Sequence, residues 1–97
     1  MNKEIDVNDF CVVHGIAADS DAELLYQYLE SIDANDIIVV LNFADIKLVY
    51  LSFFETLFSY YFSNFNNLRL YNLRLCNLTK EQLPLVKEAL LFVSSRR

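Results

Sequence analysis

The side chains that most often carry out catalysis are few in this chain and stand apart from one another. His14 is the single histidine, and its apolar, β-branched surroundings predict a core or edge imidazole in a strand rather than a general base. Cys11 and Cys76 are far apart and lack the spacing of metal ligands. Asp33 and Asp36 form a pair of carboxylates in a predicted loop, but no other reactive group converges on them.

The sequence also lacks the short motifs that build common active sites. It has no H-E-x-x-H or Cys-x-x-Cys motif, no glycine-rich phosphate loop and no G-x-S-x-G elbow. A single glycine, Gly15, leaves little backbone for a phosphate-binding nest. These observations predict a non-enzymatic binding module with no metal and no cofactor.

Charge is distributed unevenly along the chain. The net charge is −5, with ten acidic residues against Lys3 and Lys47 in residues 1–50 and an excess of basic residues after them. An acidic front half argues against nucleic acid as a ligand, because phosphate binding needs clustered Lys and Arg. The same charge suits a small, phage-type inhibitor that binds a basic protein surface, or it is ordinary solvated surface.

The longest apolar run, residues 46–62, is too short and too charged for a membrane span. It contains Lys47 and Glu55, whereas a spanning helix needs about 20 apolar residues with few or no charges. We therefore expect no membrane contact. The absence of a signal peptide predicts a cytoplasmic protein whose two cysteines are buried, reduced and inert.

Hydrophobic periodicity predicts alternating strands and helices in one domain, residues 1–97, with a core over about 9–91. The predicted elements are strands at 9–16, 37–43 and 68–73, and helices at 21–32, from 52 to 65 and after Thr79. Capping boxes are predicted at Ser20–Glu23, Ser52–Glu55 and Thr79–Gln82. This β-α-β-α-β-α order predicts an α/β fold: a small, mostly parallel sheet with helices packed on at least one face, and strand 37–43 covered on both faces.

The second predicted helix has an apolar and a polar stripe. The apolar stripe comprises Phe54, Leu57, Phe58, Tyr61 and Phe65. The polar stripe comprises Ser52, Glu55, Thr56, Ser59 and Ser63. Phe53, Tyr60 and Phe62 lie between the stripes, and we expect them to be partly exposed and to support binding of a partner or a homodimer.

A five-residue period starts at Asn67 and Asn72, each followed by Leu-Arg-Leu. It resembles the pentapeptide repeat of quadrilateral β-helices, but a solenoid needs several stacked coils to bury a core. A strand with a recurrent polar edge is the preferred interpretation.

The stretch from Ile38 to Phe53 resembles the core of STAS domains, the fold of bacterial anti-sigma-factor antagonists. Those domains have an apolar strand ending in Leu-Asp-Leu or Leu-Asp-Phe, a short link, an apolar triplet, and Asp-Ser-Ser-Gly opening a helix. Asn42 falls on the strand-end Asp; Tyr50, Leu51, Ser52 and Phe53 fall on the four residues that open the helix. Residues 68–72 are similar to the next strand of the family, and residues 83–91 to its closing helix.

The resemblance implies a regulatory protein-binding module that is switched by phosphorylation. In STAS antagonists the serine at the Ser52 position is phosphorylated by an anti-sigma serine kinase, and the dephosphorylated form binds that kinase or a similar ATPase. Ser52 is therefore the candidate phosphoacceptor, with a plain N-cap as the alternative role. The candidate partner-binding residues around it are Tyr50, Phe53, Glu55, Thr56, Ser59 and Tyr60.

Overall fold

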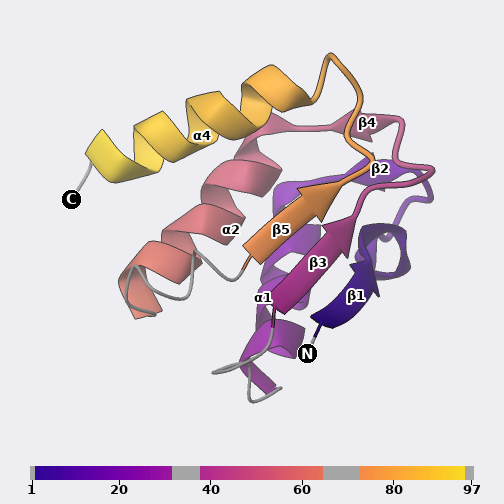
Figure 1. The fold of residues 1–97 in the computed structure, drawn as a ribbon, viewed down its shortest axis with the longest axis horizontal. Helices are drawn as coiled ribbons and strands as arrows, with labels where there is room; N and C mark the ends of the chain where they lie inside the picture. The colour runs from indigo at the N-terminus through magenta and orange to yellow at the C-terminus, as the bar shows by residue number, and fades with distance from the viewer. Residues whose placement is uncertain (1, 32–37, 65–72, 96–97) are drawn as a thin grey trace.

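The computed structural model describes residues 2–31, 38–64 and 73–95. These residues form an α/β fold with all strands paired in parallel (Figure 1). The strands are β1 (Asn2–Asp6), β2 (Ile16–Ala17), β3 (Ile38–Asn42), β4 (Leu48–Val49) and β5 (Leu73–Cys76). The helices are α1 (Asp19–Ser31), α2 (Leu51–Asn64) and α4 (Leu83–Ser95), with a short 3-10 helix, η1 (Val7–Phe10), after β1.

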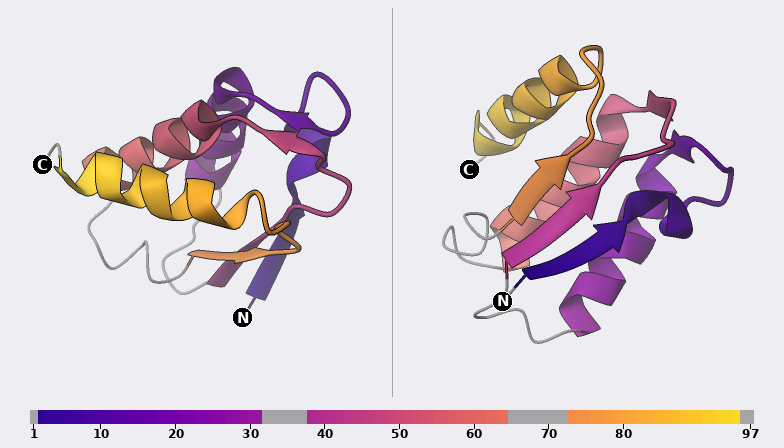
Figure 2. Two further views of the ribbon diagram at one scale, coloured as in Figure 1. Left: turned by 90° about the horizontal axis from the view of Figure 1, so that it is seen from above. Right: turned by 45° about the vertical axis from the view of Figure 1, so that its right-hand side comes forward.

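The chain repeats one strand–loop–helix unit three times. Sheet order is β1-β3-β5, so the first strand of each unit lies beside the first strand of the next unit, and β2 pairs with β4 in parallel in a second, two-stranded sheet. Asp6, Asn42 and Cys76 are paired at the ends of the three long strands. The helices stack in the same order, with α2 packed between α1 and α4 (Figure 2). This repeat is unrelated to the five-residue period of the sequence.

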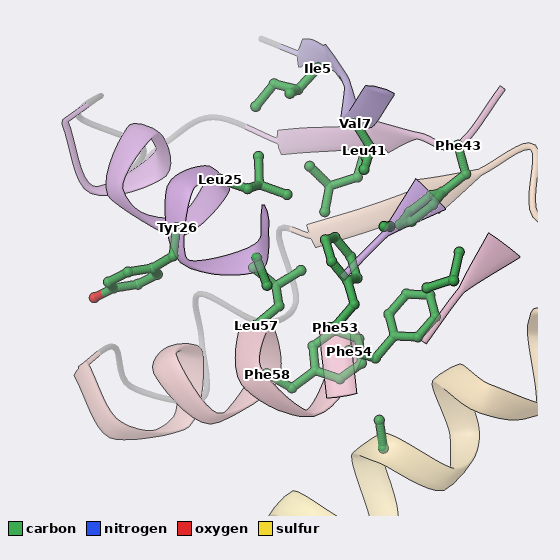
Figure 3. Close-up of a cluster of buried hydrophobic side chains, with 14 of the residues drawn as sticks. Ile5, Val7, Leu25, Tyr26, Leu41, Phe43, Phe53, Phe54, Leu57 and Phe58 are labelled. Carbon is green, nitrogen blue, oxygen red and sulfur yellow. The ribbon is translucent and has the colours of Figure 1, made fainter. Parts of the chain in front are cut away.

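Aromatic side chains from β3 and α2 fill the core. Phe43, which follows β3, meets the ring of Phe53 edge-on at 6.0 Å between centroids and the ring of Phe54 at 5.6 Å (Figure 3). Phe58 stacks on Phe54, and Leu57 is also fully buried. The predicted apolar stripe of α2 is therefore confirmed for residues 54, 57 and 58; the side chains of Tyr61 and Phe65 lie outside the described residues.

The helices cover only one face of the three-stranded sheet. In β3, Val39 and Leu41 are buried, whereas Ile38, Val40 and Asn42 are half-buried. The central position predicted for strand 37–43 is confirmed, but its burial on both faces is wrong because no described element packs on the second face (Figures 1 and 2).

The strand predicted at 9–16 does not form, and the first strand comes earlier. Val12 and Val13 are 80% and 55% exposed, and Gly15 adopts a left-handed φ of 82° that closes a turn instead of extending a strand. The side chain of Asn8 holds this turn, since its oxygen accepts a 2.9 Å hydrogen bond from the Gly15 amide and its Nδ2 lies 3.0 Å from Nδ1 of His14. His14 is thus an exposed loop residue, not a strand residue, and the core starts before residue 9.

The third predicted capping box is confirmed. The Thr79 hydroxyl accepts from the Gln82 amide at 3.2 Å, and Oε1 of Gln82 accepts from the Thr79 amide at 3.0 Å. The buried Gln82 also donates from Nε2 to the Ile46 carbonyl at 3.0 Å. It therefore ties the start of α4 to the loop after β3.

The first predicted capping box is wrong. Helix α1 begins at Asp19, and the carboxylate that accepts from the residue before the helix is that of Asp21, not Glu23. Asp21 accepts from the Ala18 amide at 2.9 Å and from the Val12 amide at 3.2 Å. Asp21 is buried and both of its carboxylate oxygens accept a backbone hydrogen bond, whereas Glu23 is exposed.

The last strand begins at Leu73 and runs to Cys76, beyond the predicted end; residues 68–72 of that prediction lie outside the described residues. None of the three described helices combines the length and apolar character needed to cross a bilayer.

Candidate functional site

An open groove of about 430 Å³ is lined by residues of all three described helices. It is lined by Glu23 of α1, by Glu55, Thr56, Ser59 and Tyr60 of α2, and by Phe92 of α4. We call these six residues the helix groove. Among the described residues, two carboxylates and no basic side chain line the helix groove, so these side chains favour a positively charged ligand.

Tyr60 joins α1 to α2 at one wall of the helix groove. Its ring stacks on Tyr26 with centroids 4.5 Å apart, and its hydroxyl donates to Oε1 of Glu23 at 3.4 Å. Partial burial and the Glu23 carboxylate raise the pKa of the Tyr60 phenol above its ordinary value. The phenol therefore stays neutral at physiological pH and remains a hydrogen-bond donor.

The polar stripe of α2 forms the floor of the helix groove. Glu55, Thr56 and Ser59 recur at helical spacing and are half-buried. The structure thus brings together four of the predicted partner-binding residues, the fourth being Tyr60. Ser63 belongs to the same predicted stripe, but its side chain lies outside the described residues.

Phe53 is buried and lies on no surface. Its prediction as a partner-binding residue is therefore wrong. Its side chain is 0% exposed and packs against Phe43 and Phe54. The sequence placed it between the two stripes of α2, but the ring of Phe43, just after β3, packs on it and extends the buried face of the helix. Tyr50, by contrast, is 49% exposed just before α2 and does not line the groove.

Ser52 is the second residue of α2 rather than its N-cap. The helix begins at Leu51, and the Tyr50 carbonyl accepts the first turn's hydrogen bond from the Phe53 amide at 3.0 Å. The predicted Ser52–Glu55 capping box is therefore wrong. Ser52 is half-buried, one turn before Thr56, and continues the polar stripe away from the groove.

Asn42 has a structural role at the position that the STAS resemblance aligns with a strand-end Asp. Its side-chain oxygen accepts from the Ala44 amide at 2.9 Å and from Nδ2 of Asn77 at 2.8 Å. Asn77 has a φ of 61°, a conformation that asparagine tolerates better than most residues. Asn42 thereby fixes the loops that follow β3 and β5.

Compared with protein-family models, curated proteins and solved structures, the chain matches none of them.

Two groove residues, Glu23 and Phe92, were not predicted. The sequence assigned Glu23 to a capping box, and Phe92 is not part of the predicted apolar stripe of its helix.

No group of three His, Cys, Asp or Glu side chains suited to a metal ion occurs within the described ranges. A second groove, of about 260 Å³, lies beside the edge strand β1 and contains none of the predicted residues.

Both cysteines are free and half-buried rather than fully buried. The Cys11 thiol donates to the Val7 carbonyl at 3.4 Å. Partial burial, followed by the charges of Asp21 and Asp6, raises its pKa from 9.0 to about 11. The thiol therefore stays protonated, and hence weakly nucleophilic, at neutral pH.

Alkylation of native Cys11 by iodoacetamide at pH 8 is expected to be about a hundredfold slower than alkylation of the same residue in guanidinium chloride, because the thiolate fraction falls tenfold per pKa unit. The native rate is expected to rise towards pH 11. Peptide mass spectrometry over a pH series measures both. Equal native and denatured rates at pH 8 would contradict a protonated, sheltered thiol.

Proposed function

We propose that this chain is a non-enzymatic regulatory protein-interaction module, and that its helix groove binds a partner segment rich in Lys and Arg. The observation that supports this most is the convergence of Glu23 and Glu55, from different helices, on one open groove. Tyr60 and Phe92 add aromatic surface, on which guanidinium groups and the stems of long basic side chains stack favourably.

Two kinds of partner fit this chemistry. The STAS resemblance implies an anti-sigma serine kinase or similar ATPase in a bacterial cytoplasm, where the two free cysteines would stay reduced. The acidic composition alone implies the basic surface of a protein that a small inhibitor blocks. In both cases charge steers the encounter, so binding weakens as salt rises.

A charge-reversal titration tests the groove. The probe is a fluorescent peptide of alternating Arg and Ser, followed by anisotropy at low ionic strength. The Glu23→Lys/Glu55→Lys variant is expected to lose about tenfold or more in affinity, since it replaces two attractive contacts by repulsion.

The matched control reverses two exposed acids outside the groove. Glu30→Lys/Glu81→Lys changes the net charge by the same amount but leaves the groove intact. We expect it to retain most of the affinity. Equal losses for the two double variants would attribute binding to net charge and reject the groove as the site.

Phosphorylation of Ser52 is the second proposal, and its support is positional. The half-buried hydroxyl lies in the first turn of α2, where backbone amides without helical partners favour negative charge. If it is the switch, Ser52→Asp abolishes capture of the native partner in a pull-down read by mass spectrometry. Ser52→Ala retains capture, and its stability changes by about 0.5 kcal/mol or less because Ser52 is not the N-cap. Unchanged capture by Ser52→Asp contradicts the switch.

A further inference from the structure

The edge of β1 that faces away from β3 has no partner strand in the described part of the chain. The order of the sheet is β1-β3-β5, so β1 is an outer strand, as Figures 1 and 2 show. An outer strand presents a row of backbone amides and carbonyls that its own sheet leaves unpaired. Such an edge can add an extended segment of another protein as one more strand.

The second groove, of about 260 Å³, lies along this edge. Four consecutive residues of β1, 3–6, line it. Successive side chains of a strand point to opposite faces of the sheet, so a groove that all four residues line follows the edge of the strand rather than one face. We call this groove the edge groove; its other lining residues are Asp9 and Phe10 of η1 and Tyr28 of α1.

The wall of the edge groove on the helix side is mostly aromatic. Ile5 and Lys3 point towards the helices, because Ile5 is buried in the core and Nζ of Lys3 lies 5.8 Å from the centre of the Tyr28 ring. The rings of Phe10 and Tyr28 are 5.3 Å apart and both residues are half-buried. An added strand would therefore place apolar side chains on this side, where the two rings offer contact and Lys3 disfavours a second cation.

The opposite wall of the edge groove is acidic. Glu4 and Asp6 alternate with the helix-facing residues of β1, so their side chains point to the other face of the sheet, and both are exposed. Asp9 is also exposed and adds a third carboxylate to the lining. Opposite charges on neighbouring strands stabilise a sheet and like charges destabilise it. A strand added beside β1 would therefore carry Lys or Arg on this side.

The same charges disfavour a second copy of this chain as the added strand. If two β1 strands paired antiparallel with the greatest overlap, Glu4 would lie opposite the partner's Glu4. Two carboxylates at directly opposed positions repel each other. The edge is therefore suited to a basic strand and not to β1 of another copy.

We propose that the edge groove binds an extended segment of another protein, which adds to β1 as a strand and alternates Lys or Arg with apolar residues. Its basic side chains lie beside Glu4 and Asp6, and its apolar side chains contact Phe10 and Tyr28. Backbone hydrogen bonds supply affinity in this mode, and alternate side chains supply specificity. No residue lines both the edge groove and the helix groove, so failure of the helix-groove experiment would leave this proposal untouched.

A pair of N-methylated peptides tests for strand addition without changing the protein. The parent probe is a fluorescent peptide of about six residues, matched to the length of β1, that alternates Arg and Val; its binding is followed by anisotropy at low ionic strength. One derivative is methylated at the Arg amides and the other at the Val amides. Alternate residues of a strand direct their amides to the same neighbour, so one derivative is expected to lose about tenfold or more in affinity while the other retains it. Equal affinities of the two derivatives would overturn the proposal.

Charge variants locate the peptide on the protein, with far-UV circular dichroism confirming the fold of each. Glu4→Lys is expected to weaken binding of the parent peptide about tenfold, because it opposes like charges. Glu81→Lys makes the same charge change at an exposed residue outside both grooves and should retain the affinity, as should Glu23→Lys/Glu55→Lys. Loss of binding in the helix-groove double variant but not in Glu4→Lys would overturn the proposal.

Hydrogen exchange of the β1 amides gives a direct readout of the edge. Saturating peptide is expected to slow exchange within residues 2–6, because the added strand pairs with amides that were open to water. Unchanged exchange at saturation would overturn the proposal. Exchange that slows with protein concentration in the absence of peptide would assign the edge to a second copy and would also overturn it.

Discussion

Replacing Phe53 with alanine is expected to lower the free energy of unfolding by about 3–5 kcal/mol, the usual cost of deleting a fully buried aromatic ring. The ring is 0% exposed and packs edge-on against both Phe43 and Phe54, so its removal leaves a cavity in the aromatic core. At about 4–8 °C per kcal/mol for a domain of this size, the melting temperature should fall by about 12 °C or more. Thermal and urea denaturation measure the effect.

Leu24→Ala is the matched control for Phe53→Ala. It also shortens an apolar helix residue, but Leu24 is 47% exposed on α1, and we expect a loss of about 0.5 kcal/mol or less. The comparison also decides the role of Phe53, since a core residue affects stability and a partner contact affects affinity. A stable Phe53→Ala variant with weakened partner binding would restore the surface role that the sequence predicted.

Hydrophobic periodicity predicted the helices that bury one continuous stripe of apolar side chains. In α1 and α2 the apolar residues recur every three or four positions, and Leu25, Leu57 and Phe58 are buried as expected. Strand β1 gave no such signal, because Asn2–Asp6 has a single aliphatic side chain, Ile5, among polar and charged residues. The run at 9–16 looked more like a strand, yet side-chain hydrogen bonds from Asn8 fold it into a turn.

The sequence predicted three strand–helix units, but it did not show which positions are equivalent, because those positions share a role and not a residue type. Asp21 and Gln82 both bridge the start of a helix to a preceding loop, whereas the equivalent place in α2 is occupied by the buried Phe53. The helix groove was half predictable for a similar reason. Its floor is one helix stripe, but Glu23 and Phe92 join it only through the packing of α1 and α4 on α2.

Removing the carboxylate of Asp21 is expected to destabilise the first repeat unit strongly. Asp21→Ala should cost about 2–4 kcal/mol, because two hydrogen bonds to a charged acceptor are lost and the amides of Ala18 and Val12 lose their partners. Asp21→Asn keeps one acceptor oxygen, so about half that loss is expected. Asp19→Ala is the control: its carboxylate is exposed and accepts from the Ser20 amide at the same helix start, and we expect about 1 kcal/mol or less.

Asp21→Asn also gives a second readout, the alkylation rate of Cys11, which reports on charge rather than on packing. The Asp21 charge is one cause of the raised pKa of Cys11, so its removal should lower that pKa and increase the thiolate fraction at a given pH. Native Asp21→Asn should consequently alkylate at Cys11 faster than the wild-type protein at pH 8, under conditions where both are folded. Lower stability with an unchanged alkylation rate would mean that the Asp21 charge does not affect Cys11. Both changes together would show that one carboxylate holds the loop and the start of α1 and also keeps the Cys11 thiol protonated.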